Sequence, residues 1–257
     1  MIGKISRIVV FMISVAVFFT LFDCGKKVRK EILSADEYFE YAKSLFDRKK
    51  YVDAITEFTV ITLKFSGNPV VDDAQFYLAE SHFHNDEYLI AASEYQKLVN
   101  DYPQSPYVEE AFYKIGLSYN KLSQRSELDQ EYTLLAIRHI QNFIEAYPKS
   151  KFREPAEKDL FNLRSKLARK QLIGGDVYRK MGIYDSAVIY YNILLEKYYD
   201  TPSAEAALYW KAECLYKLKD YDQALTNFTI FIEKYPNSKL KKNAQARISR
   251  IQKERKN

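Results

Sequence analysis

Few side chains in this chain of 257 residues could carry out chemistry, since it has only three histidines and two cysteines. His84 and Glu80 are four residues apart and would share one face of a helix, but two ligands do not make a metal site. His82 occupies a position where the surrounding pattern buries a side chain. The pair Gly174-Gly175 lacks the Gly-x-x-x-x-Gly-Lys spacing of a phosphate-binding loop. These residues predict no catalytic centre, no metal and no cofactor.

Cys24 is the residue whose setting predicts a covalent modification. Lys4 and Arg7 precede an uncharged apolar run over residues 8–22. This run is typical of a signal peptide and shorter than the roughly 20 residues of a membrane-spanning helix. The segment from Leu21 to Cys24 resembles the lipobox of bacterial lipoproteins, whose cysteine is lipidated and becomes the first residue. The two residues before the cysteine are not the small ones usual there, which leaves an uncleaved membrane anchor as the alternative.

The second cysteine and the net charge argue against a disulfide-bonded protein and against a nucleic-acid-binding one. Because the lipid would occupy Cys24, only Cys214 is left in the predicted mature domain, and disulfides are not expected. Its place on a helix predicts a small buried apolar residue. The formal net charge is +5, with basic and acidic residues interleaved, which does not predict nucleic-acid binding. Four basic residues between positions 26 and 30 fit either anionic lipid headgroups or a solvated linker.

An internal repeat organises the rest of the chain. Five alanines share one setting, with a Tyr or Leu two or three residues before each: Ala54, Ala91, Ala136, Ala187 and Ala224. Each follows a small residue on a preceding helix, by twelve positions in four cases and by twenty in the third repeat: Ala42, Ala79, Gly116, Gly175 and Ala212. Small residues let two antiparallel helices approach closely, and apolar residues four and seven positions after the alanine give the second helix one buried stripe. We call these ten residues the anchors.

The turns between the repeats also follow a regular sequence pattern. The pattern Tyr-Pro-x-Ser recurs at residues 102–105, 147–150 and 235–238. Proline cannot continue a helix, and the serine can cap the next one. Ser34 with Glu37 predicts a capping box at the start of the first repeat. Since no segment alternates like a strand, we predict an all-α stack of five helical hairpins.

Uneven spacing predicts two departures from the repeat. The third repeat has eight extra residues between its helices, around Ser123 to Gln130. The fourth repeat has surplus residues before the anchor of its first helix, and they predict one long helix from near Pro155 to Met181 that joins two lobes. We therefore expect a signal peptide at 1–23, a lipidated linker at 24–33, repeats 1–3 at 34–153 and repeats 4–5 at 154–257.

Motifs in the repeats carry a resemblance to known families. The segment Phe112-x-x-Ile115-Gly116-x-x-Tyr119 resembles the start of a tetratricopeptide repeat. Together with the lipobox-like cysteine, the Tyr-Pro-x-Ser stops and the long helix, it makes the chain resemble the BamD family, the tetratricopeptide lipoproteins of the outer-membrane β-barrel assembly machinery. The resemblance implies a scaffold without enzymatic activity, lipid-anchored at the periplasmic face of the outer membrane. It implies as partners the POTRA domains of the barrel-inserting protein, unfolded barrel proteins and, through the lipid, the membrane.

A peptide groove is expected on the first helices of repeats 1–3, which form the substrate lobe. Its positions lie three before, one after and four after the first-helix anchor: Phe39, Lys43, Phe46, Phe76, Glu80, Phe83, Tyr113, Leu117 and Asn120. Aromatic rings there would bind an unfolded, aromatic-rich strand of a barrel protein, and Lys43 would pair with the terminal carboxylate of that strand. The alternative is that the rings fill the space between neighbouring repeats.

The resemblance places POTRA docking on repeats 4 and 5. Charged residues expected on their exposed face are Arg179, Lys217, Lys219 and Asp220, although a charged surface is ordinary for a helix. A second function stays open, that of a general envelope adaptor for cell-wall, Tol-Pal-associated or secretion machinery. It would share the fold, the anchor and the groove, so only the partners separate the two.

Replacing Cys24 by Ala tests the lipid anchor. We expect the variant to incorporate no radiolabelled palmitate and to leave the outer-membrane fraction, because the lipobox-like segment then has no cysteine to carry the lipid. The measurement is metabolic labelling followed by membrane fractionation. A variant that stays in the membrane with its first 23 residues uncleaved would establish the alternative of an uncleaved anchor.

Overall fold

The computed structural model describes residues 33–255, so the predicted signal peptide, Cys24 and nearly all of the linker lie outside the described residues. Over this range the chain forms eleven α-helices and no strand, which confirms the all-α prediction. Of these helices, none is long and apolar enough to cross a membrane.

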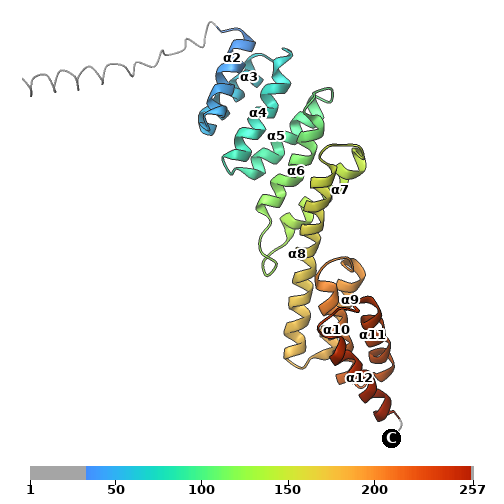
Figure 1. Ribbon diagram of the computed structural model, residues 1–257. Coiled ribbons are helices and arrows are strands. Elements are labelled where there is room, and N and C mark those ends of the chain that lie inside the picture. The colour runs from blue at the N-terminus through green and yellow to red at the C-terminus, as the bar shows by residue number, and fades with distance from the viewer. Residues whose placement is uncertain (1–32, 256–257) are drawn as a thin grey trace, which may run out of the picture.

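Ten of the helices pair as hairpins in an elongated stack (Figure 1). They are α2 (Ala35–Asp47) with α3 (Tyr51–Lys64), α4 (Val70–His84) with α5 (Tyr88–Asp101), α6 (Val108–Leu122) with α7 (Glu131–Ala146), α8 (Arg153–Lys180) with α9 (Tyr184–Lys197), and α10 (Ser203–Lys217) with α11 (Tyr221–Lys234). A further helix, α12 (Lys241–Glu254), packs on α11 and ends the described stack. The five predicted hairpins are present.

The anchors hold each hairpin together. All eight anchor alanines have no exposed surface, and the two anchor glycines are buried. A Cβ atom added to Gly116 would lie 2.5 Å from the side chain of Ile140, and one added to Gly175 would lie 2.5 Å from the ring of Tyr191. The paired helices are therefore too close for a larger residue at these positions.

The predicted capping box is present at the start of α2. The Ser34 hydroxyl accepts a hydrogen bond from the Glu37 amide at 3.3 Å, and the Glu37 carboxylate accepts one from the Ser34 amide at 2.9 Å. This backbone donor is the main reason why the pKa of Glu37 is lowered. The first helix thus begins where the sequence pattern places it.

The serines of the Tyr-Pro-x-Ser turns differ from our expectation. They do not cap the next helix, because each lies two residues before its N-cap. The Ser150 hydroxyl accepts a hydrogen bond from the amide of Phe152 at 2.9 Å and donates one to Glu109 in the preceding repeat. The Ser238 hydroxyl donates in the same way to Glu205, at 2.6 Å. These serines tie the turn to the repeat before it.

The long helix is confirmed, since α8 has 28 residues where the other helices have 13 to 16. Its middle contacts the insertion of the third repeat: the Lys166 ammonium lies 2.6 Å from the Ser123 hydroxyl, and that of Lys170 lies 2.7 Å from the Leu128 carbonyl. Arg164 reaches the turn between α9 and α10, where it donates to Asp200 at 2.7 Å. These contacts fix α8 to the repeats on both sides.

Ala91→Leu tests the hairpin contact. We expect the free energy of unfolding to fall by about 1–3 kcal/mol, because the longer side chain overpacks two helices in direct contact. The measurement is urea unfolding followed by circular dichroism. The matched control is Ala246→Leu on the exposed side of α12, which should change stability by less than about 0.5 kcal/mol. Equal stability of both variants would contradict the assignment of Ala91 as an anchor at the contact between two helices.

Candidate functional site

Three of the five rings expected to line the groove are buried. Phe39, Phe76 and Tyr113 keep only 8%, 5% and 6% of their surface exposed. Each packs on the second helix of its own hairpin, with ring centroids 5.8, 6.1 and 5.2 Å from those of Phe58, Tyr95 and Phe143. The prediction that these rings form an open groove is therefore wrong.

Helix geometry explains this correction. At 3.6 residues per turn, a position three residues before the anchor is rotated only about 60° from it around the helix. A side chain there faces the second helix together with the anchor. Tyr113 also links α6 to α8, because its hydroxyl donates to Asp159 at 2.6 Å. Burial and this hydrogen bond raise the pKa of Tyr113, so its hydroxyl remains a donor at neutral pH.

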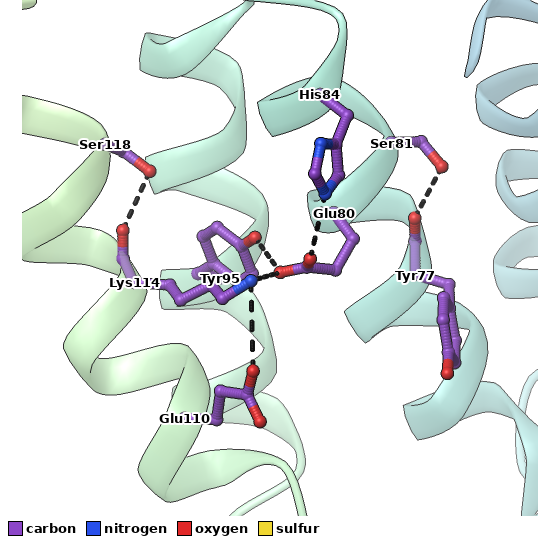
Figure 2. A network of polar contacts seen from close by, with 8 residues as sticks. All are labelled: Tyr77, Glu80, Ser81, His84, Tyr95, Glu110, Lys114 and Ser118. Carbon is purple, nitrogen blue, oxygen red and sulfur yellow. Dashed lines mark hydrogen bonds and ion pairs between the residues drawn. The ribbon is translucent and has the colours of Figure 1, made fainter. Parts of the chain in front are cut away.

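Glu80 is a second correction, since this expected groove residue is 6% exposed. Its carboxylate accepts hydrogen bonds from the Tyr95 hydroxyl and the Lys114 ammonium, and Nε2 of His84 lies 3.7 Å away (Figure 2). Burial, followed by the charge of Glu80, raises the pKa of Tyr95 well above its ordinary value. The carboxylate joins α4, α5 and α6 and is not free to bind a peptide.

The remaining five groove residues are half-buried: Lys43, Phe46, Phe83, Leu117 and Asn120. Phe46 meets the rings of Tyr51, Tyr77 and His84 at centroid distances of 5.6, 5.4 and 5.7 Å, and Phe83 meets His84 at 5.9 Å. We call these five rings the N-terminal aromatic cluster.

Sequence reasoning missed part of this cluster. Tyr51 and His84 stack at 5.3 Å with an angle of 16° between their planes, although we had weighed His84 only as a metal ligand. Over residues 33–255 no group of three His, Cys, Asp or Glu side chains lies in position to hold a metal. The signal for Tyr51 was its place three residues before the Ala54 anchor, where three of the other four repeats also carry a tyrosine.

Cations stack on rings at the junctions between neighbouring first helices. Lys43 lies 5.0 Å from the ring centre of Tyr77, and Lys114 lies 5.6 Å from that of Phe83. The later repeats have the same arrangement, with Arg179 over Trp210 at 3.9 Å and Arg247 over Tyr216 at 4.2 Å. Such contacts stabilise by about 0.5–2 kcal/mol each, depending on desolvation. The four rings are half-buried, so each keeps part of its surface exposed beside a positive charge.

A small pocket of about 110 Å³ lies at the third of these junctions, between α8, α9 and α10. It brings together Arg179 and Lys217 from the expected docking residues, and its other lining residues are Tyr184, Trp210, Glu213 and Cys214. Burial raises the pKa of the Cys214 thiol to about 12, as expected for an inert apolar residue. The pocket therefore presents a ring, a guanidinium and an ammonium together.

The other two expected docking residues lie in the turn that follows α10. Lys219 is exposed there with a positive φ of 64°. Asp220 caps α11, because its carboxylate accepts a hydrogen bond from the amide of Gln223 at 3.1 Å. The side chain of Asp220 thus holds a helix end in addition to any contact it makes with a partner.

Comparison with known proteins identifies the family. A family model described as "Outer membrane lipoprotein" and named YfiO matches residues 33–220. The chain belongs to this family. A tetratricopeptide repeat model matches residues 206–238, which confirms the repeat type. The chain is also 26% identical over 195 residues to the outer membrane protein assembly factor BamD of Rickettsia prowazekii, and the match covers 76% of this chain and 78% of that protein.

The solved structures that match this chain include tetratricopeptide proteins. The TPR2AB domain of yeast Sti1 in its complex with pHSP90 matches with a TM-score of 0.44 and 19% identity, covering 85% of this chain and 83% of that one. A tetratricopeptide protein of Thermus thermophilus matches with a TM-score of 0.35 and 16% identity, covering 85% and 98%.

The YfiO match includes the N-terminal aromatic cluster and the pocket at Arg179, since it runs from residue 33 to Asp220. Helices α11 and α12 lie beyond it. Both surfaces described above are thus part of the YfiO-family region, whereas the last helix is not.

Lys114→Met tests the buried carboxylate of Glu80. We expect a loss of about 3 kcal/mol in the free energy of unfolding, because Glu80 would keep a buried charge without its cation. Adding Glu80→Gln to the same chain should restore most of this loss, because no charge is then left unpaired. The measurement is chemical unfolding of both single variants and the double variant. The control is Lys121→Met, an exposed lysine on the same helix; a loss as large there would refute the assignment.

Proposed function

We propose that this chain is a lipid-anchored scaffold at the periplasmic face of the outer membrane, where it takes part in the assembly of β-barrel proteins. The observation that carries this proposal is the YfiO-family match over residues 33–220. The similarity of this chain to the assembly factor BamD of Rickettsia prowazekii, over 76% of the chain, supports the same role. A stack of tetratricopeptide hairpins suits it, because such stacks offer extended surfaces to protein partners.

We infer that unfolded barrel proteins bind at the N-terminal aromatic cluster. Its rings are half-exposed, rigid and arranged across α2, α3 and α4. Lys43 lies beside them, paired with Asp47 at 3.1 Å and stacked on Tyr77. An aromatic-rich strand ending in a carboxylate would find ring surface and a positive charge together here. Leu117 and Asn120 extend this surface on α6.

We infer that the POTRA domains dock on the surface around the pocket at Arg179. Trp210 and Arg179 are the residue types that most often dominate protein interfaces. The exposed Lys217 and Lys219 add positive charge beside them. Helices α2 to α4, which carry the first inferred surface, and helices α9 and α10, which carry the second, lie on opposite sides of the middle of α8, so both partners could bind to one chain (Figure 1).

The peptide surface is tested with a Phe46→Ser/Phe83→Ser chain. Binding of a synthetic peptide with the sequence of a barrel protein's last strand should weaken by more than about 1 kcal/mol, the threshold of a significant interface residue. The measurement is fluorescence anisotropy. Phe161→Ser/Tyr199→Ser removes two exposed rings outside the cluster and should bind normally. Lys43→Gln should remove the preference for a free carboxylate over an amidated peptide. Unchanged binding by the first variant would refute the surface.

Docking is tested with Lys217→Glu. We expect weaker capture of the purified POTRA domains, because the change reverses a charge at the rim of the pocket. The measurement is co-purification and its salt dependence. Lys121→Glu makes the same change on an exposed helix of the third repeat and should leave capture intact. If instead only Lys121→Glu weakens capture, the interface lies on the first three repeats.

A further inference from the structure

Charge is unevenly distributed along the chain. Residues 33–122 contain 15 acidic and 8 basic side chains, whereas residues 123–257 contain 17 acidic and 25 basic ones. The excess of basic over acidic side chains is greatest at the end of the stack, where residues 239–255 have seven basic side chains and one acidic side chain. This segment is mainly α12, which lies at the opposite end of the stack from α2 (Figure 1).

The arginines and the lysines of this segment differ in their partners. Each arginine is already neutralised: Arg247 pairs with Glu213 at 2.8 Å, Arg250 with Glu254 at 2.9 Å and Arg255 with Asp222 at 2.6 Å. Lys239, Lys242 and Lys253 are exposed and form no ion pair with any residue that the structure describes. The uncompensated positive charge of this end therefore comes from lysines.

The face that carries these lysines has no large apolar side chain that the structure exposes. Lys242, Ala246, Ser249 and Lys253 follow the spacing of one outer stripe of α12, and all four are exposed. Gln245 and Gln252 beside the stripe are exposed as well. The apolar residues Ala244 and Ile251 face the core instead.

Such a face suits a lipid surface better than a protein interface. Protein interfaces are enriched in aromatic residues, Met and Arg, and depleted in Lys. A layer of anionic headgroups requires no shape complementarity, and a lysine ammonium binds a phosphate as a point charge. The attraction falls off within a Debye length of about 8 Å at physiological salt, so it needs a membrane close by. Membership of a family of outer membrane lipoproteins provides that proximity.

We propose that the outer face of α12, with Lys239, Lys242 and Lys253, binds the surface of a bilayer that contains anionic phospholipids. The acidic first repeats are repelled by the same surface, so the charge distribution favours contact through this end of the stack. The chain would then have a second, reversible contact with the membrane, far from α2, where the chain from the N-terminus enters (Figure 1).

The experiment uses the full chain, lipidated and reconstituted on vesicles, with a donor fluorophore on Ser249→Cys. The native Cys214 is buried and does not compete for the label. Flotation first confirms that each variant is on the vesicles, so a failure of the lipid anchor is seen separately. Energy transfer to a headgroup-labelled lipid then reports how close α12 lies to the bilayer. We expect high transfer on phosphatidylethanolamine vesicles with phosphatidylglycerol, low transfer without it, and release by salt.

Lys239→Gln/Lys242→Gln/Lys253→Gln should reduce transfer on anionic vesicles to the neutral-vesicle level, because each lysine contributes about five-fold to such binding. The matched control, Lys50→Gln/Lys97→Gln/Lys121→Gln, removes three exposed lysines from the first three repeats and should leave transfer unchanged. Equal transfer on both kinds of vesicle, or equal transfer with the lysine variant, would overturn the proposal. So would low transfer on both vesicles combined with lysine-dependent binding of soluble poly-glutamate, since the face would then bind acidic protein.

Discussion

The close approach of two helices at a pair of small residues is the contact on which the rest of this structure depends. At each anchor the helices are so near that even a methyl group on Gly175 would overlap the ring of Tyr191. Larger side chains must therefore lie above and below the contact. The rings of Phe39, Phe76 and Tyr113 lie there, one turn from the anchor, and reach across to the second helix. Small anchor residues where the two helices touch thus require large side chains one helical turn away, where those side chains fill the space between the helices.

A hairpin built in this way is held to its neighbour by different interactions. Polar and cation–ring contacts join successive first helices: Glu80 binds Lys114, and Glu213 binds Arg247 with two hydrogen bonds at 3.0 and 2.8 Å. Both pairs are separated by 34 residues, nearly one repeat, and both sit at equivalent positions. Because these charges are largely buried, their geometry fixes the register of one repeat against the next more than it adds to stability.

Much of this fold could be predicted from the sequence because its determinants are local. The Ala anchors, the capping box at Ser34 and the surplus length of α8 each follow from spacing within one or two helices. The serines of the Tyr-Pro-x-Ser turns were harder to predict, because their partners Glu109 and Glu205 lie 41 and 33 residues away. The contact of Lys166 with Ser123 is of the same kind, since 43 residues separate the two.

The candidate site was predicted less well, for a related physical reason. Counting from an anchor gives the direction of a side chain around its helix, but its exposure depends on what the neighbouring helices place against it. Glu80 and Lys43 occupy equivalent positions one residue after the anchor. Glu80 is covered because Lys114 and Tyr95 converge on it, whereas Lys43 meets the ring of Tyr77 and the exposed carboxylate of Asp47 on its own helix, and it stays half-exposed.

This difference also limits where a partner can bind. A side chain that joins two repeats cannot turn toward a ligand without loosening the stack. Phe46 and Trp210 are half-buried at two junctions between repeats, and there we propose that partners bind. Since α2 to α4 and α9 to α10 lie on opposite sides of the middle of α8, the helix that lengthens the fold also separates the two proposed surfaces (Figure 1). The contacts of α8 with Ser123 and Asp200 hold this helix against the repeats on both sides, so under our proposal the length of one helix sets the spacing of the two partners.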